Sequence, residues 1–171
     1  MSTICTAVLQ RFDDRNRMSR MNQIIDLRRS SGGRKQGLTF AAVGISWSSK
    51  VGHAYVIWEE EDDQARMSTS KAIGFYPKAT LLYDVIFGGP GILKPDDERR
   101  AERKLTILVD RDDYEAAERE RDSWNSDGTY QIGVSDCVDH IASIAHKLGL
   151  KVPDSTWIQP LQFMDDIIAA N

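Results

Sequence analysis

The residues best suited to chemistry in this sequence are one cysteine and one of its histidines. Cys137 directly follows Asp136, and apolar residues recur after it at helical spacing, namely Val138, Ile141, Ala142, Ala145 and Leu148. Asp136 is typical of an N-cap, and Gly149 is typical of a helix end. The pattern predicts a helix with Cys137 in its first turn, where the helix dipole favours a nucleophilic thiolate. The carboxylates of Asp136 and Asp139 oppose that effect, and a purely apolar role for a buried cysteine stays open.

A thiolate that works near neutral pH needs a base or a cation close by. His53 opens a predicted strand directly after Gly52, which leaves room for an approaching helix. His140 lies three residues after Cys137 and could share its helix face. A histidine on a strand that meets a cysteine at a helix N-terminus is the arrangement of papain-like enzymes, in which the helix N–H groups bind an oxyanion. We therefore predict Cys137 as nucleophile and His53 as base, with His140 as the rival base.

The remaining elements follow from periodicity and from turn residues. Strands are predicted over 38–47, 52–58, 65–76 and 105–109, and helices over 12–27, 110–124 and 161–170. The acidic run 59–63 is expected to be a solvated loop, and 95–104 a charged, exposed segment or short helix. Together these elements predict an α+β fold, with an antiparallel sheet packed against the cysteine helix.

Length and composition limit the functional class. The 171 residues suit one domain, and a net charge of 22 − 26 = −4 gives no reason to expect nucleic-acid binding. No apolar run reaches membrane-spanning length, and no secretory signal is recognisable near Met1. The two cysteines, Cys5 and Cys137, provide neither a disulfide framework nor a zinc ligand set. We expect a cytoplasmic protein at synthesis, and export by a route without a cleaved signal stays open.

Two stretches resemble a known family. Gly52-His53-Ala54-Tyr55-Val56, followed by Gly74-Phe75-Tyr76-Pro77, resembles the His-bearing hairpin of circularly permuted papain-like hydrolases of the NlpC superfamily. Tyr130 to His140 resembles their Tyr-x-x-x-x-x-Asn-Cys-x-x-Phe stretch, with histidine before cysteine in the chain as in the permuted members. The resemblance covers roughly residues 39–168 and leaves 1–37 unmatched. Two positions depart from the pattern, because Asp136 replaces the common asparagine and His140 replaces the common aromatic residue.

The resemblance also implies a third catalytic residue, a polar side chain on the strand beside the histidine. If the hairpin turns near residues 62 and 63, His53 lies opposite Lys71 or Ala72. Ser70 is then the best candidate to orient the imidazole, and Ser68 is the alternative if the register slips by two. Candidate substrate contacts are Trp47, Tyr76, Tyr130 and Asp136, although aromatic residues at such positions are also common in cores.

The resemblance implies a cysteine hydrolase that cuts an amide bond without a metal or a cofactor. The first expected substrate is peptidoglycan peptide, because the superfamily includes amidases delivered as antibacterial toxins by type VI secretion. An immunity protein and the secretion machinery would then be partners. The alternatives are an isopeptidase of the PPPDE kind, a lipid acyltransferase or lipase, and an inactive module that only binds. A lipid enzyme would need an exposed apolar edge or anchor, and the sequence reveals none.

Overall fold

The computed structural model describes residues 22–29, 36–45, 51–62, 67–78 and 82–171. This part of the chain is a mixed α+β structure around a seven-stranded sheet of order β1-β6-β2-β3-β4-β5-β7. Neighbouring strands are antiparallel except for β1 and β6, which are parallel. The strands are β1 (Asn22–Asp26), β2 (Gln36–Val43), β3 (His53–Asp62), β4 (Met67–Pro77), β5 (Gly89–Pro95), β6 (Arg103–Val109) and β7 (Thr129–Tyr130).

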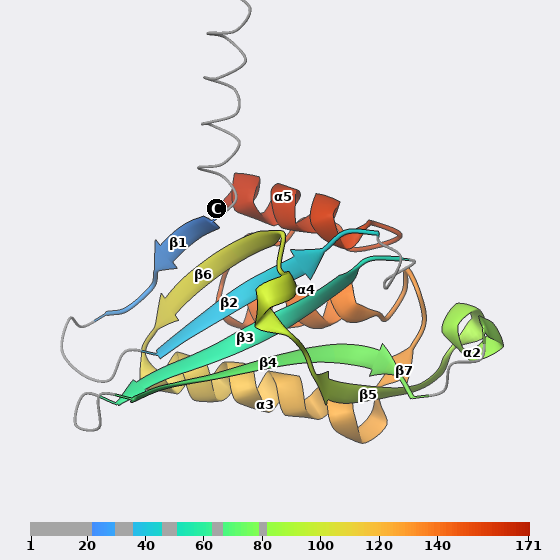
Figure 1. Ribbon diagram of the computed structural model, residues 1–171, viewed down its shortest axis with the longest axis horizontal. Coiled ribbons are helices and arrows are strands. Elements are labelled where there is room, and N and C mark those ends of the chain that lie inside the picture. Colours follow the sequence, from blue (N-terminus) through green and yellow to red (C-terminus); the bar gives the residue numbers. More distant parts are fainter. Residues whose placement is uncertain (1–21, 30–35, 46–50, 63–66, 79–81) are drawn as a thin grey trace, which may run out of the picture.

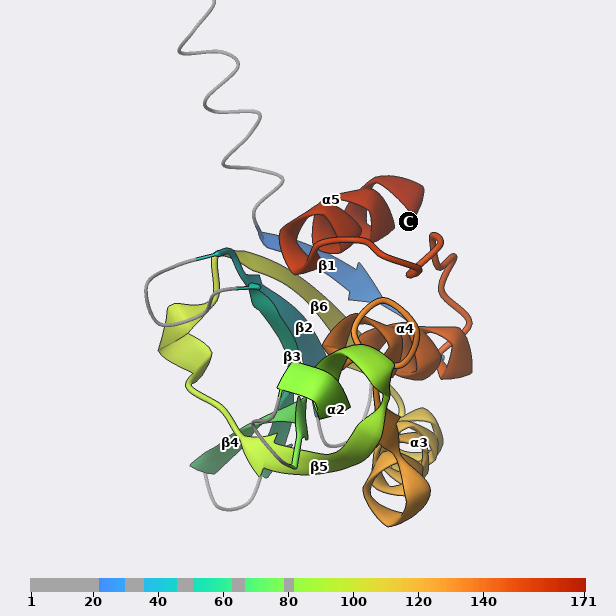
Figure 2. The ribbon, with the colours of Figure 1, turned by 90° about the vertical axis from the view of Figure 1, so that its right-hand side faces the viewer.

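The helices divide between the two faces of the sheet. The views in Figures 1 and 2 place three helices on one face, namely α3 (Arg111–Asp127), α4 (Cys137–Lys147) and α5 (Pro160–Ala170). The short 3-10 helix η1 (Glu98–Arg100) lies on the opposite face, and α2 (Leu82–Phe87) lies at one end of the sheet. The sheet therefore has a helix-covered face and a second face partly covered by the segment around η1.

Both faces of the central strands are buried, and this explains their apolar sequences. On β2, Leu38, Phe40 and Ala42 join the large core under the helices. Ala41 and Val43 alternate to the other face, where they pack with Tyr55 in a smaller cluster. Each large side chain buried in this way contributes about 1.5–3 kcal/mol to the free energy of folding.

Helix α4 forms as its sequence predicts. Asp136 is the N-cap, and its Oδ1 accepts a hydrogen bond from the N–H of Val138 at 2.8 Å. Asp139 completes a capping box, because its Oδ2 accepts from the N–H of Asp136 at 2.9 Å. After the helix, Gly149 has a φ of +76°, a conformation that favours glycine. This capping fixes the start of α4, and with it Cys137, against the sheet.

Two local predictions are wrong. Residues 22–26 form strand β1 and not the end of a helix, because they extend the sheet by parallel pairing with β6. Residues 59–62 belong to β3 and not to a loop, since they continue the pairing with both neighbouring strands. Two of the acidic side chains have polar partners there, since Glu60 Oε1 accepts from Gln36 Nε2 at 3.0 Å and Glu59 Oε2 accepts from the Thr39 hydroxyl at 3.3 Å.

His140 lies in the core between aromatic side chains. Its ring contacts Trp124 edge-on at a centroid distance of 5.5 Å and faces Phe75 at 6.1 Å. The side chain is fully buried, and neither ring nitrogen has a hydrogen-bond partner. Burial, together with the smaller effects of His53 and Arg121, lowers the pKa of His140 to about 3. His140 therefore stays neutral at physiological pH.

We predict that His140→Phe stabilises the fold, because it replaces two unpartnered buried nitrogens with an apolar ring. The expected gain in the free energy of unfolding at pH 7 is about 1–3 kcal/mol. The pKa of His140 rises toward 6.5 on unfolding. Between pH 3 and pH 6.5 the unfolded state therefore binds a proton that the folded state does not. Stability of the unmodified protein therefore falls as pH drops from 6.5 toward 3, by about 1.4 kcal/mol per pH unit from this group.

Urea unfolding at pH 7 and pH 5 checks this prediction. The gain from His140→Phe should be larger at pH 5, whereas the exposed His146→Gln on the same helix should change little. Equal stability of His140→Phe and the unmodified protein at both values would contradict the role assigned to the buried imidazole.

Candidate active site

The candidate site forms where the pairing between β3 and β4 stops. Their ladder ends at Tyr55 and Gly74, although β3 reaches back to His53 and β4 continues to Pro77. The two strands separate beyond this point in Figure 1. Ala54 is the first residue of β3 past the ladder, and its backbone N–H donates toward the thiol of Cys137. The start of α4 thus meets the sheet at a gap between two strands.

His53 reaches across β4 to a carboxylate on the far side. Its Nε2 lies 3.1 Å from Oδ2 of Asp96, the residue that follows β5, although the alignment falls short of a hydrogen bond. The path passes over Gly74, where a Cβ would lie only 2.4 Å from Nε2 and 3.0 Å from Oδ2. A glycine is therefore required at position 74 for this pair to form.

Several donors hold Asp96 as a carboxylate. The hydroxyl of Tyr76 donates to Oδ2 at 2.5 Å, and the N–H of Asp97 donates to Oδ1 at 2.8 Å. Burial alone would raise the pKa of Asp96, but interactions with His53, Tyr76 and Asp97 outweigh it and lower the pKa to about 2. The ring of Tyr76 also stacks on His53 at a centroid distance of 4.1 Å. Asp96 and Tyr76 together hold the imidazole in place.

The thiol of Cys137 is buried and protonated in the resting protein. Only 5% of the residue is exposed. Burial raises the pKa of the thiol, and the charge of Asp136 raises it further, while the N–H groups of Ala54 and Cys137 itself act in the opposite direction. The helix N-terminus is therefore not sufficient to produce a standing thiolate, and ionisation requires a base during the reaction.

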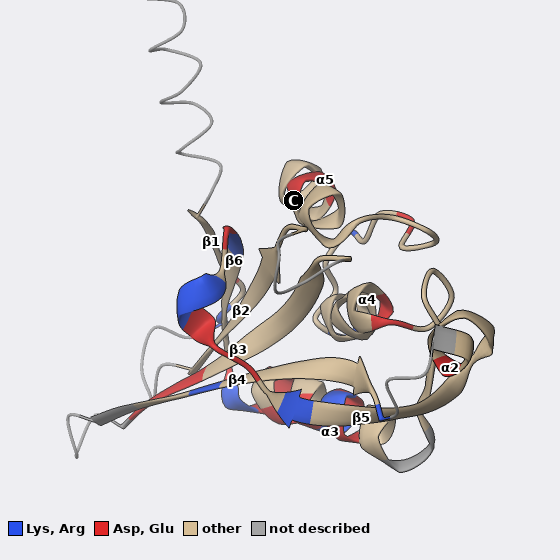
Figure 3. Cartoon of the chain, turned by 45° about the vertical axis from the view of Figure 1, so that its right-hand side comes forward, with Lys and Arg blue, Asp and Glu red and all other residues tan. Residues whose placement is uncertain are grey.

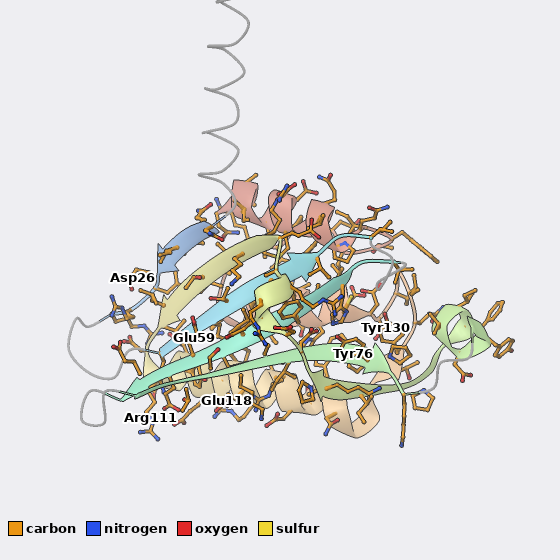
Figure 4. The ribbon with its side chains drawn as sticks, in the orientation of Figure 1. Asp26, Glu59, Tyr76, Arg111, Glu118 and Tyr130 are labelled. Carbon is orange, nitrogen blue, oxygen red and sulfur yellow. The ribbon has the colours of Figure 1, made fainter. Side chains whose placement is uncertain are left out.

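Tyr130 and Asp136 complete the surroundings of the sulfur. The Tyr130 hydroxyl interacts with Cys137, and burial raises the pKa of Tyr130, so that it remains a proton donor. Figure 4 shows Tyr130 and Tyr76 close together at this end of the sheet. Asp136 uses Oδ1 for the helix cap and accepts from the N–H of Gly133 through Oδ2 at 2.8 Å. Its primary role is therefore to shape the loop before α4.

The predicted third residue is not beside His53. The turn of the hairpin lies between the paired residues Asp62 and Met67, so that the register places position 53 level with Tyr76. Ser70 pairs with Glu59 in the ladder, and its hydroxyl donates to Glu98 at 2.5 Å. Ser68 pairs with Glu61 still farther along the strands. Trp47 and Cys5 lie outside the described residues.

Asp96 is the site residue that the sequence analysis missed. It follows Pro95 in a run of carboxylates whose composition predicts a charged, exposed segment. Its N–H bonds to the carbonyl of Ala72 at 3.0 Å, which continues the β4–β5 pairing and directs the segment along the sheet. The available signal was Gly74, since a glycine inside a predicted strand marks a close approach by another group.

A pocket of about 220 Å³ opens beside Cys137. Three segments line it: the connection between β2 and β3, the loop before α4, and the segment before α5. His53, Asp96 and Tyr76 do not contribute to its lining. Its described lining consists of Ile45, Val51, Gly52, Tyr130, Ile132, Gly133, Asp136, Cys137, Val138, Trp157, Ile158, Gln159 and Pro160.

The comparisons with known proteins add no relative. No protein-family model, no curated protein and no solved structure matches the chain. None of the described helices is long and apolar enough to cross a bilayer.

We predict that Gly74→Ala displaces His53 from Asp96 while the fold survives, because the atoms that the new Cβ would meet belong to side chains. A displacement of this kind lowers turnover by about 10²-fold or more. Gly37→Ala is the matched control, since its Cβ would meet no atom closer than 3.5 Å. Imidazole ¹⁵N spectra and turnover provide the measurements. Equal activity of the two variants would exclude the proposed path of His53 over residue 74.

We predict that Asp136→Asn makes Cys137 more reactive, because it removes a negative charge that raises the pKa of the thiol. The rate of alkylation by iodoacetamide should increase at neutral pH, about tenfold for each unit by which the pKa falls. The Cys5→Ala background leaves Cys137 as the one cysteine of the chain. The exposed Asp154→Asn should not change the rate, and a slower reaction of Asp136→Asn would refute this electrostatic assignment.

Proposed function

We propose that the protein is a cysteine hydrolase with a permuted papain-like fold that cleaves an amide bond. The observation that carries this proposal is the placement of Cys137 and His53 at the gap between β3 and β4. There, the thiol at the start of α4 meets the N–H of Ala54, and His53, the residue before Ala54 in the chain, has its Nε2 3.1 Å from Oδ2 of Asp96. A nucleophile, a base and a residue that orients the base are the parts that acyl transfer requires.

The reaction proceeds in two steps. As Sγ of Cys137 attacks the carbonyl carbon, His53 takes the thiol proton, and the backbone N–H of Cys137 stabilises the oxyanion. The C–N bond then breaks, the leaving amine takes the proton from His53, and a thioester remains on Cys137. Water attacks the thioester with His53 as base, which releases the acid and restores the thiol.

The buried, protonated thiol fits this mechanism if deprotonation accompanies the attack. Asp96 remains ionised through the working pH range and stabilises the imidazolium that forms at His53. The Tyr130 hydroxyl provides a second donor close to the sulfur. An inactive binding module would not need a buried carboxylate that meets the histidine over Gly74.

Peptidoglycan peptide is the first substrate that we propose, and this choice rests on the resemblance to permuted NlpC-type enzymes. In that case the protein is an antibacterial effector of the type VI kind, with an immunity protein as its partner. An isopeptidase that acts on a protein conjugate would use the same residues. Digestion of purified peptidoglycan, with the fragments identified by mass spectrometry, tests the choice of substrate directly.

The structure favours one alternative more than the sequence did. Large apolar side chains are exposed around the pocket, with 61% of Ile45, 56% of Val51 and 67% of Trp157 accessible to solvent. The expectation that no exposed apolar edge exists is therefore wrong. An enzyme that transfers or hydrolyses an apolar acyl ester is the second candidate, and it uses the same Cys137 chemistry.

We predict that Cys137→Ala abolishes turnover and that His53→Ala lowers it by about 10²–10⁴-fold, the usual contribution of a general base. Asp96→Asn should reduce the rate substantially because the imidazole loses its charged partner. Turnover of one substrate across pH, with folding checked by circular dichroism, provides the measurement.

Two variants serve as controls for this series. Cys5→Ala keeps Cys137, and His140→Phe replaces an imidazole that faces the core, so both should retain most of the activity. The proposal fails if Cys137→Ala retains substantial hydrolysis, or if a folded His140→Phe is inactive while His53→Ala is active.

A further inference from the structure

The pocket beside Cys137 is apolar although it adjoins a polar reaction centre. Asp136 is the one charged residue in its described lining, and its two oxygens already accept backbone N–H groups. The segment from α4 into α5 is mostly tan in Figure 3, which marks residues other than Lys, Arg, Asp and Glu. A charged group would lose its hydration in this pocket without gaining a partner of opposite charge from the described lining.

We infer that this pocket is a subsite for an apolar group on the acyl side of the bond that is cut. The inference rests on the proposed function and identifies its substrate class. The leaving group must lie near His53, because that residue protonates it. Since His53, Asp96 and Tyr76 are absent from the pocket lining, the pocket extends from the thiol away from the proton donor and receives the acyl part.

The volume limits the size of this group. Cavities of about 150 Å³ with apolar walls hold a benzene molecule, whereas drug-sized ligands need about 300–1,000 Å³. A pocket of about 220 Å³ therefore accepts an aromatic ring, a branched aliphatic side chain or a short acyl chain. A bulky, doubly charged acyl group does not fit this environment.

Trp157 forms one wall of the pocket, and its backbone is strained there. Its φ of +55° lies in the left-handed region, which is unfavourable for a residue with a large side chain. The indole lies against Gly133, where a Cβ would come within 2.4 Å of the ring. The glycine thus allows the tryptophan to lie flat beside the loop that leads to Cys137. Trp157 is a specificity-determining residue under this inference, since strained residues of this kind are concentrated at ligand sites.

The first test measures binding without catalysis. The full chain carrying Cys137→Ala is titrated with hexanamide, N-acetyl-leucine amide and N-acetyl-phenylalanine amide, and with N-acetyl-glutamine amide as the polar control. Backbone NMR signals of 132–133 and 157–160 should shift with the three apolar amides and remain unchanged with the glutamine derivative. Equal binding of polar and apolar amides, or shifts elsewhere in the protein, would overturn the subsite.

Two variants connect this binding to the pocket. Ile45→Asn and Trp157→Gly should each weaken binding of the apolar amides by about tenfold. This is the lower end of the range of affinity losses expected when one contact in a hydrophobic pocket is removed. Trp157→Gly should also fold normally, since it relieves the left-handed strain. Ile24→Asn is the matched control, because Ile24 is equally exposed, on the distant edge strand β1. An equal effect of Ile24→Asn would contradict the inference.

The second test determines whether the pocket binds the acyl side of the bond, and whether that acyl group comes from a fatty acid or from a peptide. Acylation of Cys137 in the Cys5→Ala protein is followed with p-nitrophenyl acetate, butanoate, hexanoate and dodecanoate, and with the esters of N-acetyl-leucine and N-acetyl-phenylalanine. The rate should rise about tenfold or more from acetate to hexanoate. Dodecanoate will be accepted if the source is a fatty acyl chain, and the amino-acyl esters will be preferred if the source is a peptide. A rate that depends on the size of the alcohol and not of the acyl group would overturn the inference.

The two tests separate the inference from the proposed function. If apolar amides bind at the pocket but no ester acylates Cys137, the hydrolase proposal fails and the acyl assignment fails with it, leaving an apolar binding site. If Cys137 is acylated by all esters at the same rate and no amide binds, the hydrolase stands and the subsite is wrong.

Discussion

The early end of the ladder between β3 and β4 is the constraint on which the site depends. Paired strands lie about 4.7–4.9 Å apart, too close for another segment to enter between them. Because pairing stops at Tyr55 and Gly74, the N–H of Ala54 is free to meet a sulfur from the helix-covered face. On the same stretch, His53 stacks on Tyr76 and reaches Asp96. One break in the pairing thus determines where both Cys137 and His53 lie, the proposed nucleophile and base.

The charges around this gap have opposing effects. Asp96 accepts bonds from Tyr76 and Asp97 and keeps its negative charge where an imidazolium would need it. Asp136 stabilises the start of α4, where a cap of this kind contributes about 1 kcal/mol, but its charge disfavours the neighbouring thiolate. Asp136 therefore fixes the position of Cys137 but makes ionisation of its thiol less favourable. An asparagine, common at this position in the family that the sequence resembles, would avoid part of that conflict.

Much of the fold and the placement of Cys137 at the start of a helix could be predicted, because the signals are local. The cap at Asp136, the helical spacing after it and the apolar strands are contained within short stretches of sequence. The residue that orients His53 could not be predicted in this way, because it depends on strand register. A turn at residues 62 and 63 points to Ser70, whereas the turn that forms, between Asp62 and Met67, brings Gly74 level with Tyr55 and opens the path to Asp96. The exposed apolar side chains around the pocket could not be predicted either, since Ile45 and Trp157 come from segments far apart in the chain.

The order of the elements along the chain has a consequence for biosynthesis. All seven strands of the described sheet precede Cys137, so that the sheet is synthesised before Cys137 leaves the ribosome. At about 5–20 residues per second, translation separates His53 from Cys137 by several seconds. A nascent chain can therefore assemble β2, β3 and β4 with the gap still empty, and α4 fills it late. The candidate site is incomplete until α4 has been synthesised and has docked on the sheet.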